Sequence, residues 1–295
     1  MNKLGIFMNF WEKGWAADHK KYIKKAADIG FDILEFQAQP LLEMSDDHIR
    51  ELRKAADDAG IELTYSLGLD PRFDVSSLDE TIRKGGVEYL QNIIRKMYVG
   101  GGTLLSGVSY AGWGTPADMG DSKMPYWEQS VKSMREIIKT AEDCGVTYCV
   151  EAVNRFETCI INTAKEAVEY VERIDSPNIG VLLDTYHMNI EENNIGDAIR
   201  YVGKDRLKNF HTGDNNRTAP GRGHINWDEI FKALSDIGYE GRIISEPFVM
   251  QGGEVGRDIH VFRDLIANPG EAAIDEEAKY LLNFEKEMLK KYHMA

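Results

Sequence analysis

Four residues able to bind a metal ion or transfer a proton stand at the ends of apolar runs: Glu151, Asp184, His211 and Glu246. Each run is short and apolar, which is typical of a buried β-strand. A lone carboxylate at a strand end is usually a helix cap or a surface charge, but four such ends in succession favour a shared site. Three carboxylates and one imidazole suit a hard or borderline divalent ion, namely Mn²⁺ or Mg²⁺, with Co²⁺ tolerated.

Further polar and aromatic residues follow the same strand ends or lie in the loops after them. Glu157 lies in the loop after Glu151, and His187 and Arg217 follow Asp184 and His211. From the sequence alone, His187 is equally a satisfied structural histidine, and Arg217 is equally a loop cation. Aromatic residues at such places either pack at a rim or line a ligand pocket, where sugar faces stack on rings. These aromatic residues are Phe7, Trp15, Trp113 and Phe248.

A recurring sequence pattern predicts the helices and strands that position these side chains. A helix end rich in Ala and Asp is followed by a glycine and an apolar strand, as in Ala26–Gly30 before Phe31–Phe36. Glycine after the last helical turn supplies a left-handed cap, and the alternation is typical of βα units in a parallel sheet. The predicted strands are Leu4–Met8, Phe31–Phe36, Ile61–Ser66, Thr103–Val108, Val146–Val150, Ile179–Asp184, Leu207–His211 and Arg242–Glu246.

Helical segments alternate with these eight strands, and no linker interrupts them. The clearest are Ser45–Ala59, Asp79–Tyr98, Pro125–Asp143, Ala164–Ile174, Gly196–Val202 and Trp227–Ile237. The alternation predicts an α/β protein with a (β/α)8 TIM barrel, formed by residues 1–295 as a single domain. Glu276–Tyr292 is predicted as an extra C-terminal amphipathic helix. A doubly wound sheet is the alternative, but no Gly-rich phosphate fingerprint follows the first strand.

The overall charge narrows the class of partner. The formal net charge of −14 disfavours nucleic acid and anionic membranes as partners, because phosphate binding needs a concentrated basic face.

The three cysteines are odd in number and fit a reducing cytosol better than a disulfide framework. The apolar run near the N-terminus is too short for a secretory signal, and nothing later approaches a membrane span. We therefore expect a cytoplasmic protein.

The same motifs, in the same order, resemble the D-tagatose 3-epimerase family, which includes the D-psicose 3-epimerases. The motifs that carry the resemblance are Glu151–Glu157, Asp184–Glu192, His211–Arg217, Trp227–Phe231 and Glu246–Phe248, together with the opening Met1–Phe7 and Trp11 and Trp15. The resemblance covers nearly the whole chain. It implies a (β/α)8 barrel, a bound Mn²⁺, a homo-oligomer (dimer or tetramer) and epimerisation of free ketohexoses at C3. The substrate pairs implied are D-fructose with D-psicose and D-tagatose with D-sorbose.

Carried over residue by residue, the resemblance also implies roles. The metal ligands would be Glu151, Asp184, His211 and Glu246, and Glu151 and Glu246 would also be the catalytic acid/base pair. Glu157, His187 and Arg217 would hold the O1–O3 end of the sugar, and the pocket would be lined by Phe7, Trp15, Ser66, Trp113 and Phe248. Met8–Phe10 and Ser109–Trp113 depart from the family's pattern where it touches the far end of the sugar. The preferred ketose is therefore left open.

The chemistry of a 3-epimerase agrees with this residue set. Inverting C3 requires removing a weakly acidic proton beside the C2 ketone, forming a cis-enediolate, and returning a proton to the opposite face. One carboxylate on each face can do this in both directions. Three alternatives are an aldose–ketose isomerase of the xylose-isomerase type, a metal-dependent endonuclease on a related barrel, and a sugar-binding barrel without catalysis. The isomerases usually hold two metals, the net charge opposes the endonuclease, and binding alone does not require a carboxylate on each face.

Overall fold

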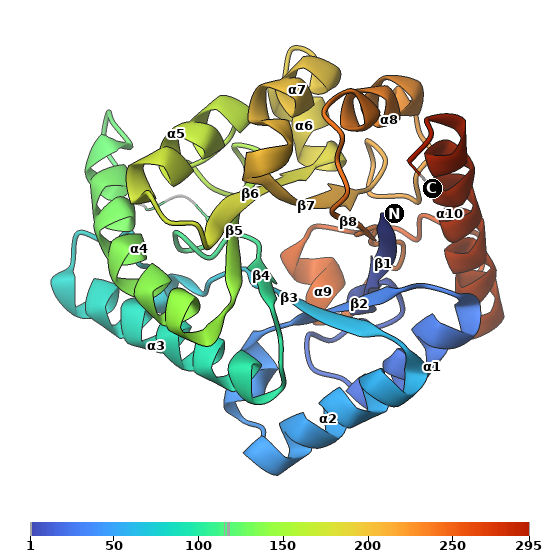
Figure 1. Cartoon of the computed structure of the whole chain (residues 1–295), viewed down its shortest axis with the longest axis horizontal. Coiled ribbons are helices and arrows are strands. Elements are labelled where there is room, and N and C mark those ends of the chain that lie inside the picture. The colour runs from blue at the N-terminus through green and yellow to red at the C-terminus, as the bar shows by residue number, and fades with distance from the viewer. Residues whose placement is uncertain (1, 115, 117–118, 295) are drawn as a thin grey trace.

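The strands close into a barrel in the computed structural model, which describes residues 2–114, 116 and 119–294. Each strand is parallel to its neighbours, and β1 pairs with β8 to complete the ring (Figure 1). The strands are β1 (Lys3–Phe7), β2 (Ile33–Gln37), β3 (Glu62–Ser66), β4 (Leu104–Ser106), β5 (Thr147–Ala152), β6 (Ile179–Asp184), β7 (Leu207–Thr212) and β8 (Arg242–Ser245). The predicted (β/α)8 barrel is confirmed.

Helices surround the barrel, and the short helix α9 lies inside this outer ring in Figure 1. The α-helices are α1 (His19–Ile29), α2 (Asp46–Ala59), α3 (Glu80–Val99), α4 (Met124–Cys144), α5 (Ala164–Ile174), α6 (Thr185–Glu191), α7 (Ile195–Arg206), α8 (Trp227–Asp236), α9 (Gly253–Asp258) and α10 (Glu271–Lys291). The described residues also form the 3₁₀ turns η1 (Met8–Phe10), η2 (Gln39–Leu42) and η3 (Pro71–Phe73). The barrel core and the inner helix faces share one large hydrophobic cluster.

Glycine caps end the helices where the sequence pattern predicts them. Gly30, Gly60 and Gly145 have φ values of 104°, 70° and 66°, in the left-handed region that residues with a Cβ adopt only at a cost. At the other end of α2, the Ser45 side chain accepts a hydrogen bond from the backbone N–H of His48 at 3.2 Å. These caps turn the chain sharply from each helix into the next strand.

The structure differs from the predicted boundaries at places that matter for the site. β1 ends at Phe7, and Met8 belongs to η1 instead of the strand. β5 continues through Glu151 to Ala152, because its pairing with β6 extends to that residue. His187 lies in the helix α6, whose N-cap is Asp184. The helix α9 and the start of α10 at Glu271 were not predicted, because neither has a strong periodic apolar pattern.

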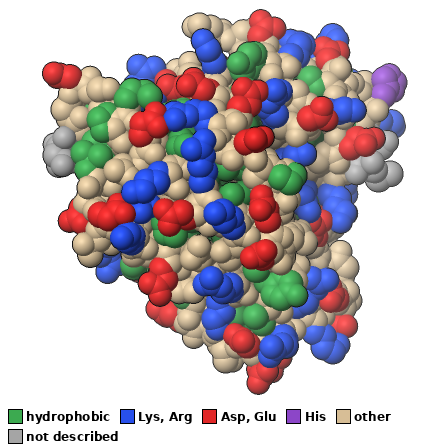
Figure 2. Space-filling view, turned by 60° about the vertical axis from the view of Figure 1, so that its left-hand side comes forward, with side chains coloured by type: hydrophobic (Ala, Val, Ile, Leu, Met, Phe, Trp, Pro, Cys, Tyr) green, Lys and Arg blue, Asp and Glu red, His purple; other side chains and the backbone are tan. Residues whose placement is uncertain are grey.

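Charges of both signs are mixed on the face of the molecule shown in Figure 2. On the face shown in Figure 2, lysine and arginine side chains alternate with aspartate and glutamate side chains. On this face, the lysine and arginine side chains therefore do not form one concentrated basic patch. Within the described part of the chain, none of the helices combines the length and the apolar character needed to cross a membrane.

A buried glutamate ties the last helix to the barrel wall. Glu285 of α10 is fully buried, and its carboxylate accepts hydrogen bonds from Thr212 Oγ1 at 2.6 Å and Ser245 Oγ at 2.8 Å. Burial raises the pKa of Glu285 to about 7, although the two hydroxyl groups favour the charged form. Below about pH 7, the folded protein therefore favours the protonated form of this carboxyl group.

This raised pKa predicts a pH-dependent stability. The folded-state pKa lies above the ordinary value of 4.5, so stability is lost as the pH rises from about 4.5 through about 7. Glu285→Gln cannot ionise and should gain roughly 2–3 kcal/mol relative to the wild type between about pH 5 and pH 8. Urea unfolding of both proteins, with a chelator present, measures the difference at each pH. A difference independent of pH would contradict the prediction.

Candidate active site

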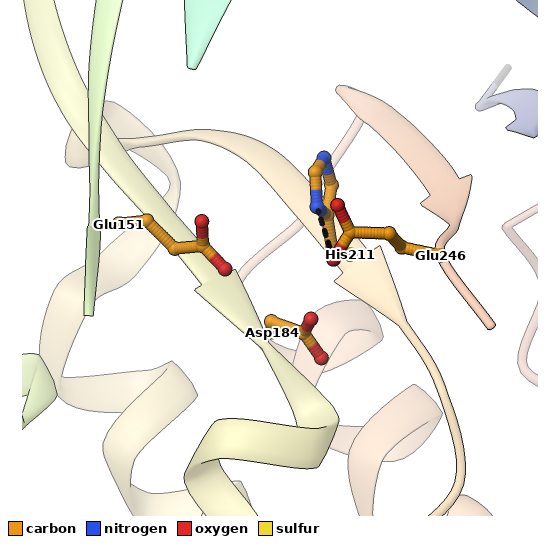
Figure 3. A group of neighbouring side chains, drawn as sticks. All are labelled: Glu151, Asp184, His211 and Glu246. Carbon is orange, nitrogen blue, oxygen red and sulfur yellow. Dashed lines mark ion pairs between the residues drawn. The ribbon is translucent and has the colours of Figure 1, made fainter. Parts of the chain in front are cut away.

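The barrel brings the four candidate ligands together, although they are far apart in the sequence. Asp184 and His211 pair in register on β6 and β7, Glu151 lies on β5, and Glu246 follows β8. All four are buried, and one ligand atom from each lies within 4.8 Å of the others. Figure 3 shows Glu151 and Glu246 pointing toward one another from opposite sides of the group.

Two buried ligand atoms lack a partner, and this tests whether a metal ion fits. Glu151 Oε1 and His211 Nδ1 have no hydrogen-bond partner among the described residues. His211 Nδ1 lies 3.7 Å from Glu246 Oε2, while its other nitrogen, Nε2, lies 2.9 Å from Glu35 Oε1. Buried polar atoms without a partner are costly, and a divalent cation would bind both. The residues therefore fit a divalent metal centre.

Arg217 links the ligand group to the neighbouring polar residues. Its Nη1 donates to Asp184 Oδ2 at 3.1 Å and to Glu246 Oε2 at 3.2 Å, and its Nη2 lies 3.6 Å from Glu157 Oε1. The guanidinium lies over the ring of Tyr186, with 4.0 Å between its Cζ and the ring centroid. A buried cation held by three carboxylates and a ring face has little freedom to move.

The loop after β7 holds Arg217 in an unusual backbone conformation. Arg217 has a φ of 65°, which a residue with a Cβ adopts only when its surroundings impose it. Asp214 supplies that constraint: its backbone oxygen accepts from the Arg217 N–H at 3.0 Å. Its side chain accepts from the Gly221 N–H at 2.9 Å and from Trp227 Nε1 at 3.1 Å. The fold of this loop therefore aims the guanidinium into the site.

His187 is held as a neutral hydrogen-bond donor. The backbone N–H of Asn154 donates to His187 Nδ1 at 3.2 Å, so in the neutral ring the proton is on Nε2. Burial and the neighbouring Arg217 cation lower the pKa of His187 well below its ordinary value. Nε2 lies 3.1 Å from Arg217 Nη2 and 3.6 Å from Glu151 Oε1. Two donors thus face one another, and a ligand oxygen between them would accept from both.

The two facing glutamates differ in their electrostatic surroundings. Burial, and then the nearby Glu246 carboxylate, raise the pKa of Glu151 well above its ordinary value. Burial also acts to raise the pKa of Glu246, but His211 and Arg217 outweigh it, and the pKa is lowered. Burial raises the pKa of Asp184 to about 6, with Arg217 opposing the rise. In the metal-free protein, Glu151 therefore holds a proton more readily than Glu246 does.

Two adjoining cavities lie beside this group. The residues that they share include Trp15, Trp113 and Glu157, and the inner cavity is also lined by Glu151 and Glu246. The outer cavity has a volume of about 680 Å³, within the range of small-molecule sites. The predicted residues that line the inner cavity are Phe7, Trp15, Ser66, Trp113, Glu151, Glu157, His187, Arg217, Glu246 and Phe248. The other two predicted residues, Asp184 and His211, are fully buried. The structure therefore gathers every predicted site residue in one place.

The aromatic wall is fixed by contacts across the barrel mouth. Phe7 and Phe248 pack edge to face, with 5.9 Å between their ring centroids. Trp15 Nε1 donates to Asp258 Oδ2 of α9 at 2.9 Å, and its backbone N–H donates to Glu254 Oε2 at 3.3 Å. The loop after β1 is thereby attached to the segment after β8, and the Trp15 indole is held at the cavity.

Sequence reasoning missed several residues that shape this site. Asn154 holds His187, Tyr186 lies against Arg217, Asp258 holds Trp15, and Glu35 contacts His211. Asn154 and Tyr186 lie inside motifs that were already singled out, so their positions were a usable signal. Glu35 also had a signal, because it is a carboxylate inside an otherwise apolar strand. Asp258 had none, since its partner is far away in the sequence.

The position of Arg217 predicts that its substitution lowers turnover without weakening metal binding. Arg217→Ala should lower kcat/KM by about 10²-fold, since a fixed charged donor to the substrate is lost. The same change should not weaken Mn²⁺ binding, because it removes a cation that contacts two candidate ligands. Steady-state kinetics and Mn²⁺ titration of the metal-free protein measure the two effects. Unchanged kinetics in the Arg217→Ala variant would indicate that Arg217 has only a structural role.

Comparison with known proteins places the chain among sugar epimerases. Residues 23–284 match the family described as xylose isomerase-like TIM barrel. The chain is 45% identical to the D-psicose 3-epimerase of Ruminiclostridium cellulolyticum over 287 residues, which are 97% of this chain and 98% of the relative. It is 39% identical to the D-psicose 3-epimerase of Agrobacterium fabrum over 287 residues, 97% of this chain and 99% of the relative. The chain also resembles the crystal structure of D-psicose 3-epimerase with D-tagatose from Clostridium cellulolyticum, with a TM-score of 0.94 and 45% sequence identity. The match covers 97% of this chain and 99% of that chain.

Proposed function

Because the chain belongs to the D-psicose 3-epimerase family of xylose isomerase-like TIM barrels, we propose that it is a metal-dependent ketose 3-epimerase that interconverts free ketohexoses at C3. We propose D-fructose with D-psicose and D-tagatose with D-sorbose as substrate pairs. The observation that carries the proposal is the pair Glu151 and Glu246, which face one another across the ligand group (Figure 3).

These two glutamates are the proposed acid/base pair. One carboxylate removes the C3 proton from one face of the sugar, and the other returns a proton to the opposite face. In the reverse reaction the two exchange roles, so either epimer is a substrate. The intermediate is a cis-enediolate across C2 and C3, whose negative charge needs fixed cationic and donor groups beside it.

His187 and Arg217 supply such donors from this chain. His187 Nε2 and Arg217 Nη2 are 3.1 Å apart, and a sugar oxygen placed between them would accept from both after a small separation. Glu157, close to Arg217, would accept from a sugar hydroxyl. Together these three residues would orient the end of the sugar that carries C1 to C3. The aromatic rings of Trp15, Trp113, Phe7 and Phe248 and the Ser66 side chain would then bound the rest of the pocket.

The metal centre is proposed to comprise Glu151, Asp184, His211 and Glu246, and the ion to be Mn²⁺, with Co²⁺ or Mg²⁺ as substitutes. When bound, such an ion would supply Lewis-acid polarisation of the C2 carbonyl and stabilise negative charge on the neighbouring oxygens. We also propose that the enzyme works in the cytoplasm as a homo-oligomer, a dimer or a tetramer, with residues 1–295 as a single domain.

The proposal is tested by identifying products and the position of solvent hydrogen. The enzyme is incubated with Mn²⁺ and D-fructose, D-psicose or D-tagatose in D₂O, and the products are analysed by chromatography and NMR. We expect D-fructose to give D-psicose with deuterium at C3, because the carboxylate that returns the proton exchanges with solvent.

Other products would contradict the proposal. An aldose product would identify an aldose–ketose isomerase on the same barrel. An epimer without deuterium at C3 would exclude proton transfer through exchangeable carboxylates. Sugar binding without any product would indicate a sugar-binding barrel without catalysis.

A further inference from the structure

A second buried carboxylate lies inside the barrel, behind the proposed metal ligands. Glu35 of β2 is fully buried. Its Oε2 accepts from Thr64 Oγ1 at 2.9 Å and from Ser106 Oγ at 3.5 Å, and its Oε1 lies 2.9 Å from His211 Nε2. An ionised carboxylate at this depth is costly unless it is paired. Within the described residues, Glu35 forms its ion pair with His211.

We propose that Glu35 is a positioning residue for the metal centre, acting through His211. Glu35 Oε1 lies 2.9 Å from His211 Nε2, so a ring with its proton on Nε2 would present the lone pair of Nδ1 to the ligand group. That Nδ1 is buried and has no hydrogen-bond partner among the described residues, as an unfilled ligand position requires. A carboxylate on the far nitrogen fixes the tautomer and ring orientation of a metal-binding histidine and makes the ligating nitrogen more basic. The inference rests on the proposed metal centre.

The surroundings of Glu35 separate this role from a catalytic one. Glu35 is absent from the described residues that line the two site cavities, so it does not reach the substrate. Instead it sits in a layer of polar side chains that cross the barrel interior. Asn209 belongs to this layer: its Nδ2 donates to Ser106 Oγ at 3.2 Å and lies 3.1 Å from His211 Nε2. These contacts fix the position of the Glu35 carboxylate relative to the His211 ring.

The test is the affinity of the metal-free protein for Mn²⁺, measured by calorimetry and by electron paramagnetic resonance. Glu35→Gln keeps the size of the side chain and removes its charge, so it should weaken Mn²⁺ binding by about 10- to 100-fold. Glu285→Gln is the matched control, because it alters a buried glutamate that contacts β7 and β8 but none of the four candidate ligands. Its Mn²⁺ affinity should stay close to that of the wild type.

A double-mutant cycle shows whether Glu35 acts through His211. In a His211→Asn background, Glu35→Gln should cause little further loss of Mn²⁺ affinity, since the residue it orients is already gone. Equal losses in both backgrounds, or an unchanged affinity in Glu35→Gln, would overturn the inference. So would a loss in Glu285→Gln as large as that in Glu35→Gln.

Two further measurements keep the inference testable and separate it from the proposed function. If Glu35→Gln does not fold, Thr64→Val removes the hydroxyl group that holds Glu35 Oε2. It should weaken Mn²⁺ binding several-fold, and wild-type affinity there would overturn the inference. A wild-type protein that binds no Mn²⁺ would refute the proposed metal centre itself. A wild-type protein that binds Mn²⁺, with Glu35→Gln equal to it, would refute only the role of Glu35.

Discussion

Glu246→Gln should abolish epimerisation in both directions, with a loss in kcat of at least about 10³-fold at saturating Mn²⁺. General acid–base catalysis contributes roughly 10²- to 10⁴-fold, and this substitution also removes one negative charge from the candidate ligand group. The loss should be similar with D-fructose and with D-psicose, because the acid of one direction is the base of the other. Gln has nearly the volume of Glu, so the barrel should keep its fold.

Saturating metal separates the two roles of Glu246. A titration of activity against Mn²⁺ gives the concentration needed for saturation, and the rate at saturation then reports the acid/base role. Glu285→Gln serves as the control for a conservative change in a buried glutamate, since it contacts Ser245 beside Glu246 but lies outside both cavities. A Glu246→Gln variant that retained a tenth or more of the wild-type kcat would refute the assignment.

The position of the site was predictable because it depends on strand order and strand ends. In a parallel barrel the carboxyl ends of all strands meet at one mouth, so a polar residue ending each apolar run is enough to locate it. Asp184 and His211 pair in register, and Glu246 directly follows β8. The short apolar runs located each strand to within a few residues, and glycine caps marked the helix ends before β2, β3 and β5.

Contacts between distant segments could not be predicted in the same way. Parallel strands are buried on both faces, so the alternation of side chains does not show that Glu35 points into the barrel toward His211. Glu285 interrupts an apolar helix face, and its Oε1 accepts hydrogen bonds from Thr212 and Ser245 of two distant strands. The contact of Asp258 with Trp15 likewise depends on the closure of the barrel between β1 and β8. These contacts arise from tertiary geometry and not from local propensity.

Removal of divalent metal should eliminate turnover, and added Mn²⁺ or Co²⁺ should restore it. Three carboxylates and an imidazole lie within 4.8 Å of one another in a buried pocket. Without a cation, the charge of Arg217 is shared among Asp184, Glu246 and Glu157. The burial-raised pKa of Glu151 then favours its protonated form. A divalent ion would compensate the charge of these carboxylates and of the developing enediolate oxygens, so its removal should leave the intermediate without that stabilisation.

The measurement combines kinetics with metal analysis and thermal unfolding. The protein is dialysed against a chelator, its metal content is determined, and activity is followed as Mn²⁺, Co²⁺ or Mg²⁺ is returned. Metal that binds only the folded state should also stabilise it by about 2.7 kcal/mol when its free concentration is 100 times Kd, which raises Tm. Asp184→Asn removes one ligand charge at nearly constant size, so it should need a higher Mn²⁺ concentration for the same rise in Tm. Full activity in protein shown to be metal-free would refute the metal centre. An unchanged Mn²⁺ requirement in Asp184→Asn would show that Asp184 is not one of the metal ligands.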